Sequence, residues 1–307
     1  MYYSGFADEA CSSIDDQIKI TKELGWNNIE SRGIDGTTLA EMDEKSFEIL
    51  EQKLSESNVK IDCYGSAVAN WSKDPRKEED YLKSKKELLS VLPRMKRLKI
   101  HLLRGMSFVI VKDDPRGPDN PEIEKEVFKK VKEFVIICAD YDVVYLHENC
   151  QNYGGLSWKH TLRLIEAVNR ENFRLVFDTG NPVMSYDWSV PSLKKRQSSW
   201  EFYEKVKDFV DRVHIKDGIF VKDTDGVFPE VKFTFPGEGD GDVERIVEDL
   251  LKRNFTGALS IEPHMAVVHH ENSKKSDNEI RYENYLEYGR RLMNMVENLK
   301  KKINAGK

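Results

Sequence analysis

The chain contains four short apolar runs that each end beside a metal-ligand residue type. The runs are Val143–Leu146 before Glu148, Phe173–Phe177 before Asp178, Val210–Val213 beside His214, and Ala258–Ile261 before Glu262. Short apolar runs of this kind are typical of buried parallel strands. In folds built from such strands, functional side chains gather at the carboxyl ends of the strands. Three carboxylates and one imidazole at four such ends therefore predict a site for one divalent cation.

Strand patterns and helix patterns alternate along the whole chain. The expected strands are Tyr2–Ala7, Asn28–Ser31, Val59–Tyr64, Leu98–Leu103, Val143–His147, Arg174–Asp178, Arg212–Lys216 and Gly257–Glu262. The expected helices are Asp15–Leu24, Asp43–Ser57, Lys77–Leu92, Pro121–Ala139, Trp158–Asn169, Trp200–Phe209, Asp242–Arg253 and Tyr282–Lys302. Regular alternation favours a parallel sheet with helical crossovers, and eight repeats predict closure into a (β/α)8 barrel.

Chain length agrees with a single domain. Such a barrel takes about 250 residues, so we expect residues 1–307 to form one α/β domain. The third helix is expected to stop at Pro93, because proline removes a helical donor and clashes with the preceding turn. The connection from Gly218 to Gly241 is long, and Val231–Phe235 could form a small extra hairpin within it.

Composition limits the partners and the compartment. The formal net charge is −6, and the short lysine runs have glutamates beside them, so we expect no nucleic-acid partner. The four cysteines form no CxxC pair, which is typical of reduced thiols in a cytoplasmic protein. We find neither a signal-peptide pattern nor an apolar stretch long enough to span a bilayer, so no membrane partner is expected.

The sequence blocks around the four expected ligands resemble a known superfamily. The blocks are Leu146–Asn149 (LHEN), Phe177–Pro182 (FDTGNP), Val213–Asp217 (VHIKD) and Ser260–His264 (SIEPH). Three more are Ala7–Ala10 (ADEA), Ile29–Gly33 (IESRG) and Pro236–Gly241 (PGEGDG). Together they resemble the sugar isomerase/epimerase superfamily with the xylose-isomerase-like TIM barrel, which includes the ketose 3-epimerases. The resemblance is greatest to the branch called sugar phosphate isomerase/epimerase.

The resemblance implies a metal-dependent reaction on a small-molecule sugar. Glu148, Asp178, His214 and Glu262 would be the metal ligands, and Glu148 and Glu262 would also be the acid and base on opposite faces of the sugar. The cation would stabilise an enediolate formed from a 2-hydroxy ketone. An oxygen-rich ligand set suits Mn²⁺ first, with Mg²⁺, Co²⁺ or Zn²⁺ as alternatives.

Candidate substrate contacts follow other expected strands or flank the expected ligands. They are Glu30, Arg32, Ser66, Arg104, Asn181, Lys216 and His264. Arg32 or Arg104 could hold an anionic substrate group with two hydrogen bonds, and each could equally belong to an ion-pair network. Lys216 shares a strand face with His214 and could contact a sugar or phosphate, or pair with Asp217 or Glu238. The glycine-rich segment 237–241 lacks a P-loop lysine, which favours a simple turn.

One position departs from the well-studied ketose 3-epimerases. They carry a histidine three residues after the aspartate ligand, where this chain has Asn181. The substrate therefore stays open among a free or phosphorylated ketose, a keto-glycoside, a cyclitol and a sugar acid.

Three rival functions could use the same barrel. A cyclitol or sugar dehydratase would use the same metal site, and a non-catalytic barrel would only bind a sugar. An endonuclease of the endonuclease IV type is disfavoured, because that chemistry needs more histidines and Asn181 stands where one is required. Pairing of chains into a homo-oligomer is a further prediction without interface support in the sequence.

Overall fold

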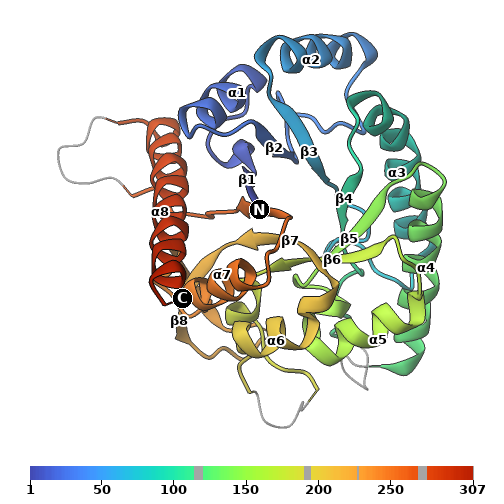
Figure 1. Cartoon of the computed structure of the whole chain (residues 1–307). Helices are drawn as coiled ribbons and strands as arrows, with labels where there is room; N and C mark the ends of the chain where they lie inside the picture. Colours follow the sequence, from blue (N-terminus) through green and yellow to red (C-terminus); the bar gives the residue numbers. More distant parts are fainter. Residues whose placement is uncertain (114–119, 190–194, 227, 269–274, 307) are drawn as a thin grey trace.

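Eight parallel strands form one sheet that curls into a nearly closed barrel (Figure 1). The structure is a computed structural model that describes residues 1–113, 120–189, 195–226, 228–268 and 275–306. The strands are β1 (Tyr2–Gly5), β2 (Asn28–Ser31), β3 (Lys60–Gly65), β4 (Leu102–Gly105), β5 (Val144–Glu148), β6 (Phe173–Asp178), β7 (Val210–Ile215) and β10 (Ala258–Ile261). They pair in the order β1-β10-β7-β6-β5-β4-β3-β2, and the end strands β1 and β2 contact each other. The predicted (β/α)8 barrel is confirmed, whereas the single domain over 1–307 stays a prediction.

Helices surround the strands on the outside of the barrel (Figure 1). They are α1 (Ile14–Glu23), α2 (Glu44–Ser57), α3 (Glu78–Leu98), α4 (Pro121–Ala139), α5 (Trp158–Val168), α6 (Ser199–Val206), α7 (Val243–Lys252) and α8 (Asp277–Ala305). Several begin with the capping residues that their sequences offer, such as Ser13 before α1 and Ser276 before α8. Among the described helices, none combines the length and apolar character needed to cross a membrane.

Beneath the ends of the strands, the interior of the barrel contains apolar side chains on one side and the buried Arg212 on the neighbouring strand, where Val176 pairs with Arg212 in register. Cys63, Leu146 and Val176 form a small buried cluster, separate from the main core between sheet and helices. Leu146 shares a strand face with Glu148, and Val176 shares one with Asp178, because successive residues point to opposite faces. The apolar cluster therefore lies beneath these two carboxylates, which sit at the ends of their strands.

The predicted end of the third helix at Pro93 is wrong. Helix α3 continues through Pro93 to Leu98, and β4 begins only at Leu102. Pro93 is on the exposed side, whereas Leu92 and Met95 are fully buried. The Arg94 side chain also donates to the Leu39 carbonyl at 2.6 Å. Tertiary packing of this segment therefore outweighs the local cost of proline in the helix.

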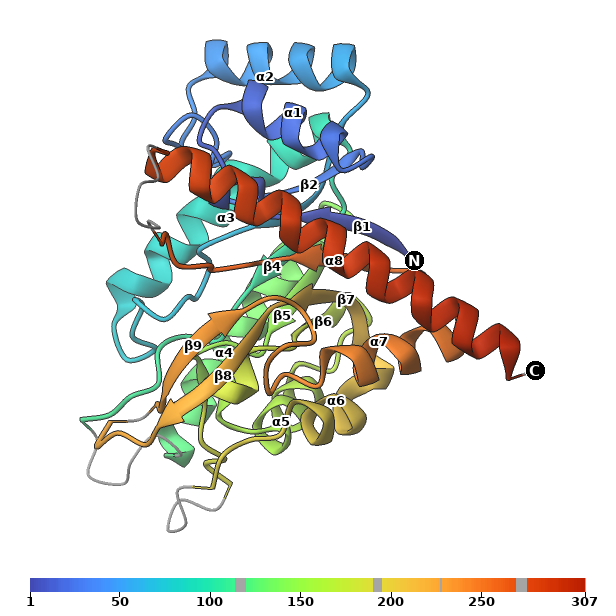
Figure 2. The ribbon, with the colours of Figure 1, turned by 90° about the vertical axis from the view of Figure 1, so that its left-hand side faces the viewer.

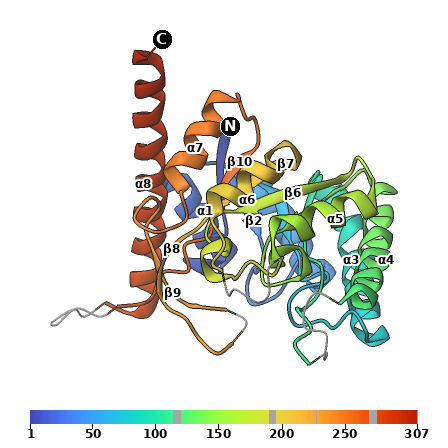
Figure 3. The same cartoon turned by 90° about the horizontal axis from the view of Figure 1, so that it is seen from below.

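The long connection after β7 contains the expected extra hairpin. Strands β8 (Asp217–Lys222) and β9 (Glu230–Thr234) pair antiparallel. They lie on the side of the barrel away from the N-terminus of β1, where the strands end (Figures 2 and 3). The Asp217 carboxylate accepts backbone N–H groups of four glycines at 2.8–3.1 Å, namely Gly218, Gly237, Gly239 and Gly241. The glycine-rich segment thus folds around Asp217, and these amides are not free to bind phosphate.

Candidate metal centre

The four residues expected as ligands converge at one end of the barrel. Glu148 ends β5, Asp178 ends β6, His214 is the fifth residue of β7, and Glu262 follows β10 directly. One donor atom from each lies within 4.8 Å of the other three, and all four residues are buried. The parallel register of neighbouring strands produces this convergence, since it aligns their carboxyl ends.

The His214 ring meets the requirements of a metal ligand. Its Nδ1 atom is buried and makes no hydrogen bond within the described part of the chain. Oxygens of Glu148, Glu262 and Asp178 surround it at 3.7, 3.8 and 4.0 Å. Two donors on opposite sides of a small divalent cation, each about 2.1 Å from it, are separated by about 4.2 Å. The four donors are therefore close enough to share one ion, and the site fits the group that the sequence predicts.

Lysine and backbone groups support the carboxylates. The Lys216 ammonium lies 2.8 Å from Asp178 Oδ2 and 3.0 Å from Glu262 Oε2. Asp178 Oδ1 accepts the backbone N–H groups of Gly180 and Asn181, both at 2.8 Å. Lys216 is therefore part of the cage, and its partners are not Asp217 or Glu238.

The pKa values of two carboxylates in this cage are shifted in opposite directions. Burial raises the pKa of Asp178 to about 6, although Lys216 opposes the shift. Burial acts in the same direction on Glu262, but Lys216 and the other nearby cations hold its pKa well below the usual value. The Asp178 carboxylate is thus the member of the set that most needs further positive charge to stay ionised near neutral pH.

A buried ionic network lies behind His214. The Glu30 carboxylate is 3.1 Å from His214 Nε2, and it accepts from Arg212 Nε at 2.7 Å and from Ser260 Oγ at 2.6 Å. Arg212 is fully buried and also pairs with Asp62 at 2.7 Å. Burial would raise the pKa of Glu30, but Arg212 and His214 hold it far below its usual value. Hydrogen bonding at Nε2 leaves Nδ1 as the ring atom that faces the cage.

Two of the candidate substrate contacts lie beside Glu262. Arg32 Nη1 is 3.4 Å and His264 Nε2 is 3.5 Å from Glu262 Oε1. Arg32 also pairs with Asp8, and His264 Nδ1 lies 2.9 Å from Glu9 Oε1. Both residues therefore stand at the edge of the candidate metal centre.

Three further candidates lie beside Glu148. Arg104 Nε is 3.3 Å from Glu148 Oε2, and Asn181 Nδ2 donates to Glu148 Oε1 at 3.1 Å. The Asn181 side-chain oxygen is buried with no hydrogen bond in the described part of the chain. The Ser66 hydroxyl donates to the Arg104 carbonyl at 2.6 Å. Ser66 thus holds the end of β4, and Glu30 lies behind His214, so both have protein partners where a substrate contact was expected.

Three residues of this region were not singled out from the sequence. Arg212 precedes His214 by two positions, and the period of two along a strand could have placed it on the same inner face. The Phe6 ring packs edge-on against His214 and lies under the guanidinium of Arg32, with its centroid 4.7 Å away. Glu9 binds both the side chain and the backbone N–H of His264. Glu9 lies in the block Ala7–Ala10, but neither it nor Phe6 was a candidate for the site, because their partners are distant in sequence.

His147 faces away from the candidate ligands, as strand alternation predicts. Its Nε2 atom lies 2.9 Å from the Ser107 hydroxyl, and the ring is fully buried. Burial lowers the pKa of His147 to about 4. This histidine is therefore neutral at physiological pH, and its ring packs between β5, Ser107 and Phe173.

Comparison of sequences relates the chain to one family. The family described as "Xylose isomerase-like TIM barrel" matches residues 18–287. No curated protein matches the chain in sequence.

Solved structures resemble the chain over almost its whole length. A D-tagatose 3-epimerase-like protein has 16% identity and a TM-score of 0.71, with 99% of this chain and 100% of that chain covered. A xylose isomerase-like TIM barrel protein from Mycobacterium smegmatis in complex with magnesium has 14% identity and a TM-score of 0.65, with 96% and 97% covered. The probable 3-DHS dehydratase AsbF of petrobactin synthesis from Bacillus anthracis has 14% identity and a TM-score of 0.65, with 92% and 97% covered. At these identities the likeness shows the fold.

The Glu30 network leads to a prediction about metal affinity. Glu30→Gln removes the carboxylate that faces His214 Nε2, and we expect divalent-metal affinity to fall roughly 10- to 100-fold. Calorimetric titration of the metal-free protein with Mn²⁺ measures this change. Glu87→Gln is the matched control, since Glu87 binds the Ala67 backbone N–H elsewhere in the barrel. Unchanged affinity in Glu30→Gln would contradict the positioning role.

Burial of His147 leads to a prediction about pH. Its pKa is about 4 when folded and about 6.5 when unfolded, so between these values the unfolded chain binds the extra proton. The free energy of unfolding should therefore fall as pH decreases through this window. From pH 7 to pH 5 this group contributes a loss of about 2 kcal/mol. Urea unfolding of metal-free wild type and His147→Gln at both pH values tests it, and equal losses in the two proteins would refute it.

Proposed function

The chain belongs to the xylose isomerase-like TIM barrel family, and we propose that it is a divalent-metal-dependent sugar epimerase or isomerase. Its substrate is a ketose, a keto-sugar derivative or a sugar phosphate that carries a hydroxyl next to its carbonyl. The observation that carries the proposal is the convergence of Glu148, Asp178, His214 and Glu262 within 4.8 Å. Mn²⁺ is the first candidate for the ion, with Mg²⁺, Co²⁺ or Zn²⁺ as alternatives.

The two glutamates are the proposed acid and base. They come from β5 and from the end of β10, which are separated in the barrel by β6 and β7, so they approach a substrate from different sides. A bound cation would act as a Lewis acid on the substrate carbonyl. One glutamate then removes the proton from the neighbouring carbinol carbon, and the other returns a proton to the opposite face. This division of roles inverts one carbon without net gain or loss of atoms.

Each glutamate is held by a matched pair of neighbours. Glu148 contacts Arg104 through Oε2 and Asn181 through Oε1. Glu262 contacts Arg32 through Oε1 and Lys216 through Oε2. These contacts fix the orientation of both carboxylates, as proton transfer requires.

The neighbours of the two glutamates are also the proposed substrate contacts. We assign donors to substrate oxygens in Arg32, Arg104, Lys216 and His264, and an acceptor in the Asn181 side-chain oxygen. Glu30 and Ser66 are assigned to holding the site, because their oxygens are already engaged by the protein.

The chemical test uses solvent deuterium. With Mn²⁺ added, the protein should incorporate one deuterium from D₂O at the carbinol carbon of one member of a panel of ketoses and keto-glycosides. Glu148→Gln and Glu262→Gln should each reduce this rate by at least about 100-fold, since each loses a proton-transfer group. EDTA should abolish the exchange in the wild type, and Mn²⁺ should restore it.

The control is Glu297→Gln on α8, because Glu297 forms a surface pair with Lys300. Wild-type rates in either active-site variant would reject the two-base scheme. Water loss instead of epimer formation would favour a dehydratase on the same metal site. Sugar binding without proton exchange would identify a non-catalytic barrel.

A further inference from the structure

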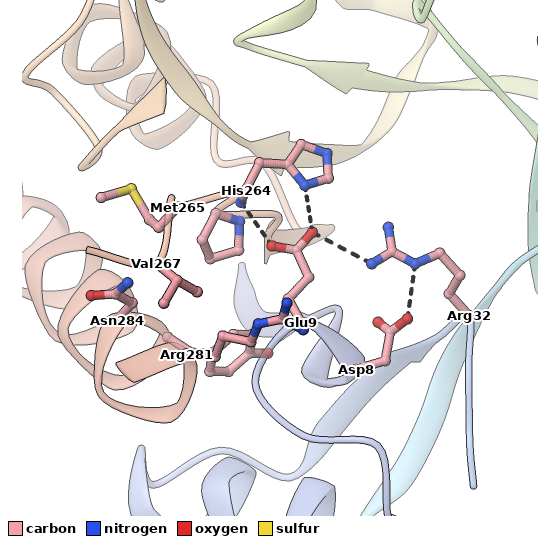
Figure 4. A pocket seen from close by; sticks show the side chains of 10 residues that line it. Asp8, Glu9, Arg32, His264, Met265, Val267, Arg281 and Asn284 are labelled. Carbon is pink, nitrogen blue, oxygen red and sulfur yellow. Dashed lines mark hydrogen bonds and ion pairs between the residues drawn. The ribbon is translucent and has the colours of Figure 1, made fainter. Parts of the chain in front are cut away.

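A cavity of about 390 Å³ is lined by Arg32 and His264, the two residues that contact Glu262 Oε1 (Figure 4). It lies between the segment after β1, the end of β2, the segment after β10, and α8. Its polar lining consists of Asp8, Glu9, Arg32, His264, Arg281 and Asn284. Arg32 and His264 join it to the candidate metal centre through their contacts with Glu262 Oε1 at 3.4 and 3.5 Å. The volume falls within the range of about 300–1,000 Å³ that is usual for small-molecule sites.

The carboxylates of this cavity are already compensated by protein cations. Glu9, Glu262 and His264 lie close enough together to hold a second metal ion. However, the Arg32 guanidinium contacts Glu9 at 3.5 Å and Asp8 at 2.9 Å, as well as Glu262. A second cation at this place would have to displace that guanidinium. The arrangement therefore favours a ligand without positive charge.

The cavity nevertheless offers both free donors and free acceptors. Arg281 makes no hydrogen bond or ion pair that involves another described residue, although it lines the cavity from α8. Asp8 Oδ1 is buried and has no hydrogen-bond partner in the described part of the chain. The Asn284 amide group donates at 3.4 Å to the Ala266 carbonyl, which leaves its oxygen as an acceptor. Sugar hydroxyl groups both donate and accept, so they match such a mixture.

The rest of the lining is apolar, and it argues against a phosphate group. Pro263, Met265, Val267 and the Tyr285 ring contribute to the wall. These surfaces suit the C–H faces of a sugar ring. A phosphate would bring close to two negative charges beside Asp8 and Glu9, and Arg32 is already shared between these two carboxylates and Glu262.

We propose that this cavity is a subsite for a neutral glycosyl group, so that the substrate is a keto-sugar carrying a second sugar unit. The inference rests on the proposed function, because it places the reacting carbons at the metal centre and the second unit next to Glu262. Arg281, Asp8 and Asn284 bind hydroxyl groups of that unit. A free ketose would leave the cavity to water and would bind more weakly.

Calorimetric titration of the Mn²⁺-loaded protein tests the subsite with three defined sugars. They are fructose, isomaltulose and fructose 6-phosphate. Isomaltulose is fructose with a glucosyl group on the end of the chain away from its carbonyl. Wild type should bind isomaltulose at least about tenfold more tightly than either other sugar. Arg281→Ala removes a donor, and Asn284→Trp fills the cavity. In each variant the ratio of the affinity for isomaltulose to that for the other sugars should fall close to one. Both changes lie on the outer helix α8, so folding should be retained.

Arg290→Ala is the matched control, because Arg290 lies on the same helix but pairs with Glu23. It should keep the wild-type ratio. The subsite would be overturned if wild type bound isomaltulose no more tightly than fructose, or bound neither of these two sugars. It would also be overturned if both cavity variants kept the wild-type preference for isomaltulose. Tighter binding of fructose 6-phosphate that depends on Arg281 would replace the glycosyl group by an anion. If the protein exchanges the carbinol proton of ketoses but does not prefer isomaltulose, the subsite alone is overturned. If it shows neither proton exchange nor this preference, the proposed function is overturned as well.

Discussion

The excess of buried negative charge at the carboxyl end of the barrel is the constraint on which the rest of the site depends. In the cage and in the network behind His214, five carboxylates have side chains at most 6% exposed, those of Glu30, Asp62, Glu148, Asp178 and Glu262. Three permanently charged partners are equally buried, Arg104, Arg212 and Lys216. When His214 is neutral, as a metal ligand must be, the five carboxylates exceed these three buried cations by two charges, and only the partly exposed Arg32 and His264 lie beside Glu262. Because an uncompensated buried charge costs several kcal/mol, a divalent cation at His214 Nδ1 would balance the set.

The same constraint explains the polar layer beneath the ligands. Arg212 neutralises Glu30 and Asp62, and Glu30 orients His214, so each charge in the interior has a partner with good geometry. A guanidinium suits this task because its planar fork can bind two carboxylates at once. The cage above and the network below are therefore linked through a single imidazole ring. Mutations in the lower layer should act on the metal centre without touching it.

Local sequence patterns were sufficient to predict the main features of the fold and the convergence of the four expected ligands. Apolar runs that end at Glu148, Asp178, His214 and Glu262 predicted both the parallel strands and the convergence, because strand ends in a barrel meet at one rim. The prediction that was wrong, the end of the third helix at Pro93, depends on contacts between residues distant in sequence. Helix α3 passes Pro93 because its inner face packs well, and a sequence window contains no measure of that packing.

The residues around the expected ligands show the same contrast between local patterns, which are predictable, and contacts between distant segments, which are not. The sequence predicts Glu30 near the site but gives no sign of its contacts with Arg212 and His214, because these partners lie more than 180 residues away. For Lys216, the alternative of a pair with Asp217 or Glu238 is wrong, because its ammonium pairs with Asp178 and Glu262. Arg281 follows no strand, and its place in the cavity wall depends on the position of α8 in the folded chain. The positions of functional side chains along single strands were thus predictable, whereas contacts between different strands and helices were not.

The most direct measurement is the metal stoichiometry of purified protein, obtained by Mn²⁺ titration monitored by electron paramagnetic resonance. The account predicts one tight site per chain in the wild type. His214→Ala should lose more affinity than Glu30→Gln, because it removes a ligand and not a support. Absence of a tight site in folded wild type, or an unchanged site in His214→Ala, would contradict a shared cation at these four residues.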